Sequence, residues 1–298
     1  MIYKKEKIIL ILNFLLTITC LAFITTEIVS MKANSLSHSK QLITSRDGVR
    51  AFNNQIEGQP LKNISKSLPT DITLDELSQL VFKKSYNQII KSAETECSAL
   101  LMQQWPGRAG IYIGVGEIKD TLSNDIDIPA QIFITIFKIN KPHNFEIISR
   151  TEKPFTFMIE NPAKIEDFDN ADPLDELVRI DCAPFQIAPN EFAFGLRLAC
   201  NKGYAGGFAQ FHNLILFSIK DKNLVPILNI PIYSLQNLAG NWNEDGTRQH
   251  YVIEREWVVC LTQKKHNGYF DLQIKQKKVK NKSYQLIWTS GKYLCTQK

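Results

Sequence analysis

The sequence predicts a mainly β protein, an antiparallel sandwich preceded by an N-terminal helical segment. After Gly110, apolar residues alternate with polar or small ones, whereas helical spacing of apolar residues occurs only before it. Asn267-Gly268 and Ser290-Gly291 mark tight hairpin turns, and about ten to twelve short strands are expected. An incomplete propeller is the alternative, because "GYFDLQI" and "YQLIWTSGKY" have the spacing of a blade's outer strands. No period of about 40 residues repeats, which disfavours the propeller.

Residues 1–33 have the pattern of an export segment. Three lysines precede an apolar run from Ile8 to Thr26. The run is longer than the roughly 7–15 residues of a cleaved signal peptide and close to the roughly 20 that span a bilayer as helix. The sequence therefore predicts either a signal peptide or a retained transmembrane anchor, which would be the contact with the membrane. Both place the protein in the periplasm, free or anchored. Thr19 disfavours lipidation at Cys20.

Three further regions follow the export segment. Residues 34–69 are rich in Ser, Asn and Lys without a sustained period, which predicts a flexible tether. Residues 70–109 are predicted to be helical, because Thr73 and Glu76 have the spacing of a capping box and apolar residues then recur with a helical period to Leu101. An all-β domain is predicted over residues 110–298.

Charge is distributed unevenly along the chain, although the formal net charge of +5 is modest and does not suggest a nucleic-acid partner. Residues 160–181 carry eight acids against two bases, and residues 251–298 carry ten bases against three acids. The basic segment predicts a partner such as an anionic envelope polymer or another envelope protein. The alternative is a solvated strand edge whose lysines discourage pairing with another sheet.

The alternation of residues between the two faces of each strand also predicts which side chains of neighbouring strands lie opposite each other. Five cysteines follow the export segment, and an exported protein can oxidise them. Cys182 and Cys200 fall on the apolar faces of two strands joined by "QIAPNE", which predicts a hairpin disulfide, with two buried thiols as the alternative. The two tight turns pair Leu261 with Ile274 in one hairpin and Trp288 with Tyr293 in the other.

Two acidic stretches are weak candidates for calcium binding; otherwise no cofactor is expected. Asn241, Asn243 and Asp245 before Gly246 resemble the start of a calcium loop, but Val252 stands where a bidentate glutamate is needed. A turn between strands is the favoured interpretation. The second stretch, residues 166–176, matches no standard ligand spacing and is more simply a solvated loop; its candidate ligands are Asp167, Asp169, Asp172 and Asp175.

Catalytic patterns are not apparent in the sequence. The five histidines are scattered, and only His250 has nearby carboxylates on the same strand face, Glu254 and Glu256. A non-catalytic binding module is therefore the favoured prediction. Two alternatives stay open: a hydrolase or metal-dependent enzyme that joins the 166–176 carboxylates to His212 or His250, and an inhibitor or immunity protein against a secreted enzyme.

The segments "RIDCAPFQIAPNEFAFGLRL", "NLILFSIKDKNLVPIL" and "GYFDLQI" occur in this order. Together they resemble a family of exported bacterial envelope proteins without a characterised activity. The resemblance covers about Arg179–Ile274. It implies a signal-bearing envelope protein and assigns no catalytic or ligand residues. Cys182 and Cys200 are not among its pattern positions.

Overall fold

The computed structural model describes residues 40–43, 72–90, 95–106, 108–120, 128–165, 168, 172–279 and 282–296. The chain divides into two compact units, 1–40 and 41–298, and every described residue except Lys40 belongs to the second. The predicted export segment lies outside the described residues. So does most of the predicted tether, in which β1 (Lys40–Ile43) is nevertheless a strand that pairs with β10. Within the described part, none of the helices has the length and apolarity to cross a bilayer.

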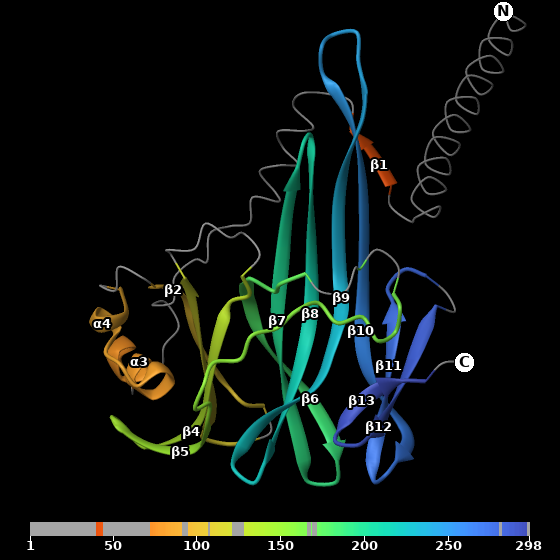
Figure 1. Cartoon of the computed structure of the whole chain (residues 1–298). Coiled ribbons are helices and arrows are strands. Elements are labelled where there is room, and N and C mark those ends of the chain that lie inside the picture. Colours follow the sequence, from red (N-terminus) through yellow and green to blue (C-terminus); the bar gives the residue numbers. More distant parts are fainter. Residues whose placement is uncertain are drawn as a thin grey trace, which may run out of the picture. The chain divides into compact units, whose positions relative to one another are not determined.

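Two antiparallel sheets form the body (Figure 1). The larger has the order β13-β12-β11-β10-β9-β8-β7-β6, and the smaller the order β2-β3-β4-β5. One buried cluster contains residues of both sheets, including Ile113, Ile134, Phe194 and Phe217. The fold is thus the predicted sandwich-like arrangement of antiparallel sheets, which the structure shows to be open, and the propeller alternative is wrong. The strands are β2 (Thr95–Gln104), β3 (Ile111–Asp120), β4 (Gln131–Lys141), β5 (Asn144–Arg150), β6 (Glu176–Ala188), β7 (Glu191–Tyr204), β8 (Gly207–Lys220), β9 (Asn223–Trp242), β10 (Arg248–His266), β11 (Tyr269–Gln276), β12 (Ser283–Thr289) and β13 (Lys292–Cys295).

The helical segment is shorter than the sequence predicts. Helix α3 (Leu74–Phe82) begins at the expected capping box, in which Thr73 and Glu76 exchange hydrogen bonds, and α4 (Tyr86–Ile90) follows. Residues 95–104 were expected to continue the helix but form β2, which pairs with β3. A register shift in β2 between Cys97 and Ala99 breaks the alternation of faces, so that the apolar residues take on a spacing that resembles a helix.

Helix α3 packs against the smaller sheet, on the face turned away from the shared core (Figure 1). Two glycines of β3 make this close approach possible. A Cβ atom at Gly116 would lie 2.0 Å from Cζ of Phe82, and one at Gly114 would lie 3.0 Å from Cγ2 of Val81. The smaller sheet is therefore covered on both faces, by the larger sheet and by α3.

The C-terminal strands form the predicted meander of hairpins. In the β12–β13 hairpin the predicted pair Trp288–Tyr293 is confirmed, and Leu286 pairs with Cys295 in the same ladder. In the β10–β11 hairpin, Lys265 pairs with Phe270 as a two-residue turn requires, but Leu261 pairs with Leu272 rather than Ile274. A register shift between Leu261 and Lys265 changes the pairing beyond the turn, and alternation alone does not reveal such a bulge.

The predicted disulfide is wrong, although the predicted hairpin between β6 and β7 is present. Neither Cys182 and Cys200 nor the other three described cysteines form a disulfide. Glu176 pairs with Ala199 and Asp181 pairs with Gly195, so Cys182 and Cys200 lie near opposite ends of the ladder. At the rise of an extended chain this separates them by about 20 Å. The sequence places both cysteines on apolar faces but does not determine the length of the turn.

Candidate functional site

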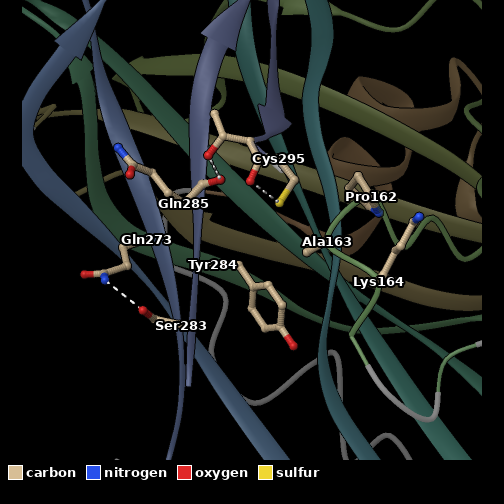
Figure 2. A pocket seen from close by; sticks show the side chains of 9 residues that line it. Pro162, Ala163, Lys164, Gln273, Ser283, Tyr284, Gln285 and Cys295 are labelled. Carbon is tan, nitrogen blue, oxygen red and sulfur yellow. Dashed lines mark hydrogen bonds between the residues drawn. The ribbon is translucent and has the colours of Figure 1, made fainter. Parts of the chain in front are cut away.

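A cavity of about 510 Å³ lies between the loop at residues 162–164 and the C-terminal meander (Figure 2). Its volume is within the range of about 300–1,000 Å³ that is usual for small-molecule sites. The lining is contributed by the loop, by β11, by the first half of β12 and by the end of β13. The nine lining residues are Pro162, Ala163, Lys164, Gln273, Ser283, Tyr284, Gln285, Cys295 and Thr296.

A buried amide holds the loop wall of the cavity in place. The Asn161 side chain accepts a hydrogen bond from Ile165 N at 2.8 Å and donates to the carbonyl oxygens of Ile165 and Phe168 at 2.7 and 3.2 Å. Lys164 has a left-handed backbone with φ of 49°, and its N–H donates to Asn161 O. These bonds close a compact turn that presents Pro162, Ala163 and Lys164 to the cavity.

The strand wall combines an aromatic ring, a thiol and amides. Figure 2 shows Tyr284 on the side of Lys164, whereas Gln273 and Ser283, whose side chains hydrogen-bond at 3.1 Å, extend to the other side. Tyr284 and Cys295 are both partly buried against the core. Burial raises the pKa of the Cys295 thiol, so this cysteine is a neutral group and a poor nucleophile at neutral pH.

The surface of the meander is basic. Asp271 is the only acid between Tyr269 and Cys295, and it is fully buried, where His266 Nδ1 at 2.6 Å and Gln285 Nε2 at 3.0 Å bind its two oxygens. Lysines of the same segment are exposed to solvent: Lys275, Lys277, Lys278 and Lys292. Among the described residues of β11 to β13 the exposed formal charge is therefore entirely positive, although Lys277 pairs with Glu256 of β10 at 2.5 Å.

The first predicted calcium stretch forms the turn between β9 and β10. Asp245 Oδ1 accepts hydrogen bonds from Thr247 N at 2.9 Å and Thr247 Oγ1 at 2.6 Å, while Asn243 Nδ2 donates to Thr247 Oγ1 at 2.8 Å. Asn241 lies on the adjoining end of β9. Two of the three candidate ligands therefore stabilise a turn, as the favoured interpretation of this stretch requires.

The second calcium stretch is described only in part, since Asp167 and Asp169 lie outside the described residues. Asp172 forms an ion pair with Lys202 at 2.5 Å. Burial raises the pKa of the Asp175 carboxyl, which opposes the charged form that calcium binds. Among the described residues, no group of three or more histidine, cysteine, aspartate or glutamate side chains is arranged to hold a metal ion. The calcium prediction gains no support from this part of the chain.

The histidines named in the enzyme alternative do not meet its carboxylates among the described residues. His212 lies in β8 with its ring 4.8 Å from that of Tyr233, and burial lowers its pKa to about 4. Glu176 is in the same row but two strands away, about 10 Å by strand spacing. His250 Nδ1 lies 2.8 Å from Asn237 Oδ1, whereas Glu254 accepts from the Tyr233 hydroxyl at 3.2 Å.

Sequence reasoning did not predict the cavity or the buried His266–Asp271 pair. The cavity brings together residues about 120 positions apart, and no local pattern indicates that proximity. Asp271 stands in an alternating strand segment beside a turn, where an acid normally faces solvent. A histidine near the other side of the same turn is the only signal that could have suggested the pair.

Comparisons with known proteins do not assign the chain to a family: no family model, no curated protein and no solved structure matches it.

Proposed function

We propose that this protein is an exported bacterial envelope protein whose β body is a non-catalytic binding module for an anionic envelope polymer. The N-terminal sequence pattern and the resemblance over Arg179–Ile274 support export to the envelope. The basic surface of the meander carries the binding part of the proposal. A surface with one sign of charge attracts oppositely charged partners over about 8–10 Å at physiological ionic strength.

The burial of Asp271 is the single observation on which this proposal depends. If this carboxylate faced solvent, it would lie among the lysines of the meander and partly neutralise them. Its contacts with His266 and Gln285 hold it inside instead. Two further acids lie close to this surface: Glu256 is engaged by Lys277, and Glu191 accepts a hydrogen bond from Ser218 and interacts with Tyr269. Consequently Lys275, Lys278 and Lys292 have no carboxylate partner among the described residues and are available to an anionic polymer.

Co-sedimentation of the full-length protein, in mild detergent, with insoluble envelope polymers tests the proposal. We expect the protein to sediment with an anionic polymer but not with a neutral one of similar size, and to be released in about 1 M salt, where the Debye length falls to about 3 Å. The triple variant K275E/K278E/K292E should bind at least about tenfold more weakly. A charge-matched control, K141E/K153E/K222E, changes exposed lysines outside the meander and should bind normally.

Equal sedimentation with neutral and anionic polymers would contradict the proposed binding mode. So would equal losses in the two triple variants. Cell fractionation tests the location separately: recovery of the protein in the cytosol would contradict export, whereas mass spectrometry of envelope-derived protein would distinguish a cleaved signal peptide from a retained anchor.

A further inference from the structure

We propose that the cavity between the 162–164 loop and the meander binds one acidic sugar unit of the polymer. In this arrangement Tyr284 packs against the face of the sugar ring and Lys164 pairs with its acidic group. The inference rests on the proposed function, because the basic surface of the meander brings the polymer to the cavity. It goes further in assigning a specific subsite and a ligand class.

The charge of the cavity favours an anion. Its nine lining residues include one cation, Lys164, and no carboxylate. Lys164 is exposed and forms no ion pair with any described residue. Lys275 stands directly opposite Ser283 in the β11–β12 ladder, and Lys282 precedes Ser283 in the chain. A carboxylate in the cavity would therefore meet Lys164 on the side of Tyr284, with Lys275 beyond Ser283 on the opposite side, whereas a cationic ligand would be repelled.

The aromatic ring in the strand wall favours a sugar over a bare anion. A sugar ring has apolar C–H groups on its face and hydroxyl groups around its edge. Tyr284 offers the matching surface, since its ring is held against the core on one side and its hydroxyl forms no hydrogen bond with any described residue (Figure 2). Rigid amphipathic side chains of this kind provide contact area with little loss of conformational entropy.

Hydrogen bonds within the chain hold the walls of the cavity in place. Asn161 fixes the loop through its three side-chain hydrogen bonds. The β11–β12 ladder fixes Tyr284, which pairs with Ile274, and the β12–β13 ladder fixes Cys295, which pairs with Leu286. The hydrogen bond between Gln273 and Ser283 orders the far side. Binding therefore requires little rearrangement of the backbone, which lowers the entropic cost of holding a small ligand.

Calorimetric titration of the full-length protein with three probes tests this inference. The probes are a uronic-acid tetrasaccharide, a neutral tetrasaccharide and inorganic phosphate. We expect the uronic-acid probe to bind at least about tenfold more tightly than either of the others. Lys164→Gln should abolish this preference for the acid, and Tyr284→Leu should weaken both sugars. The matched controls Lys141→Gln and Tyr251→Phe, which lie outside the cavity, should leave binding unchanged.

Each alternative result has a definite meaning. If phosphate binds as tightly as the uronic-acid probe, the cavity is an anion site and the sugar assignment is overturned. If the acid binds but neither cavity variant changes its affinity, while thermal melting shows both variants to be folded, the cavity is not the subsite. If no sugar probe binds although the protein still sediments with the anionic polymer, this inference fails and the proposed function stands. Loss of polymer binding in the wild-type protein overturns both.

Discussion

The smaller sheet and the C-terminal meander are both built from consecutive antiparallel strands but have very different surfaces. The smaller sheet is covered on both faces, by the shared core and by α3, and Gly114 and Gly116 allow the helix to lie directly on β3. The meander buries one face and exposes lysines and a cavity on other parts of its surface. The smaller sheet therefore contributes mainly packing, whereas the meander presents side chains that a ligand can contact.

The largest effect on stability is expected from Gly116→Ala. The new Cβ would overlap the Phe82 ring, 2.0 Å from its Cζ, so this buried ring must shift and α3 loses packing against the sheet. We expect a loss of about 3 kcal/mol or more in the free energy of unfolding, at the upper end of what overpacking costs. Urea denaturation measures it. Gly203→Ala is the matched control, because its Cβ would meet no atom within 4 Å. Similar losses in both variants would show that the contact with α3 does not matter.

Removal of the partner of the buried meander carboxylate should have the next largest effect. His266→Ala leaves one oxygen of Asp271 without its 2.6 Å contact. The expected loss in unfolding free energy is about 1–3 kcal/mol. His143→Ala removes a comparable 2.9 Å contact to Glu76, but this pair is exposed and should contribute less than about 1 kcal/mol. Thermal melts of both variants at pH 7 make the comparison, and equal losses would show that burial of Asp271 adds nothing.

Two buried titratable groups should give opposite pH dependences. Burial lowers the pKa of His212 in the larger sheet from 6.5 to about 4, so its contribution to stability is lost as the pH falls through this window. Burial raises the pKa of Glu117 in β3 above 4.5, so its contribution favours the folded state at low pH and is lost as the pH rises through its folded pKa. Over its pH window, each group should change the free energy of unfolding by on the order of 1 kcal/mol.

The variants His212→Gln and Glu117→Gln separate these two slopes. In urea denaturations between pH 6.5 and pH 4, His212→Gln should lose less unfolding free energy than the wild type as the pH falls. The second should lose the decline that accompanies rising pH just above 4.5, because its amide can still accept from Leu177 N and donate to Ser98 Oγ. Parallel pH profiles for wild type and both variants would show that neither group titrates as its burial implies.

The smallest effect on stability is expected for the exposed lysines of the meander. Lys278→Gln removes charge without removing packing, and the unfolding free energy should change by less than about 0.5 kcal/mol. The same substitution should weaken sedimentation with the anionic polymer measurably. A large loss of stability would mean that the meander depends on this residue for folding, which would remove the proposed distinction between the two regions.

The fold was predictable because the alternation after Gly110 and the two tight turns depend on local sequence. The Trp288–Tyr293 pair follows from the Ser290-Gly291 turn alone. By contrast, β2 and the register of Leu261 depend on bulges, which place extra residues in a strand without a clear local signal. The cavity forms where the loop with Lys164 meets the strand with Tyr284. The alternation of apolar residues does not predict that these two segments lie close together. The sequence showed only that the strand wall belongs to a basic segment and the loop wall to the acidic segment 160–181.

The amide that orders the cavity also differs in chemical durability from the amide at the hairpin turn. Asparagine deamidates when the backbone nitrogen of the next residue attacks its side-chain carbonyl and ammonia is released. Pro162 follows Asn161 and has no N–H for this reaction, so the loop wall is protected against it. Gly268 follows Asn267 and offers little steric hindrance at an exposed turn, although the Asn267 amide donates to Trp288 O at 3.0 Å. In long-lived protein, spontaneous deamidation should therefore convert the hairpin tip to an acid and spare the loop.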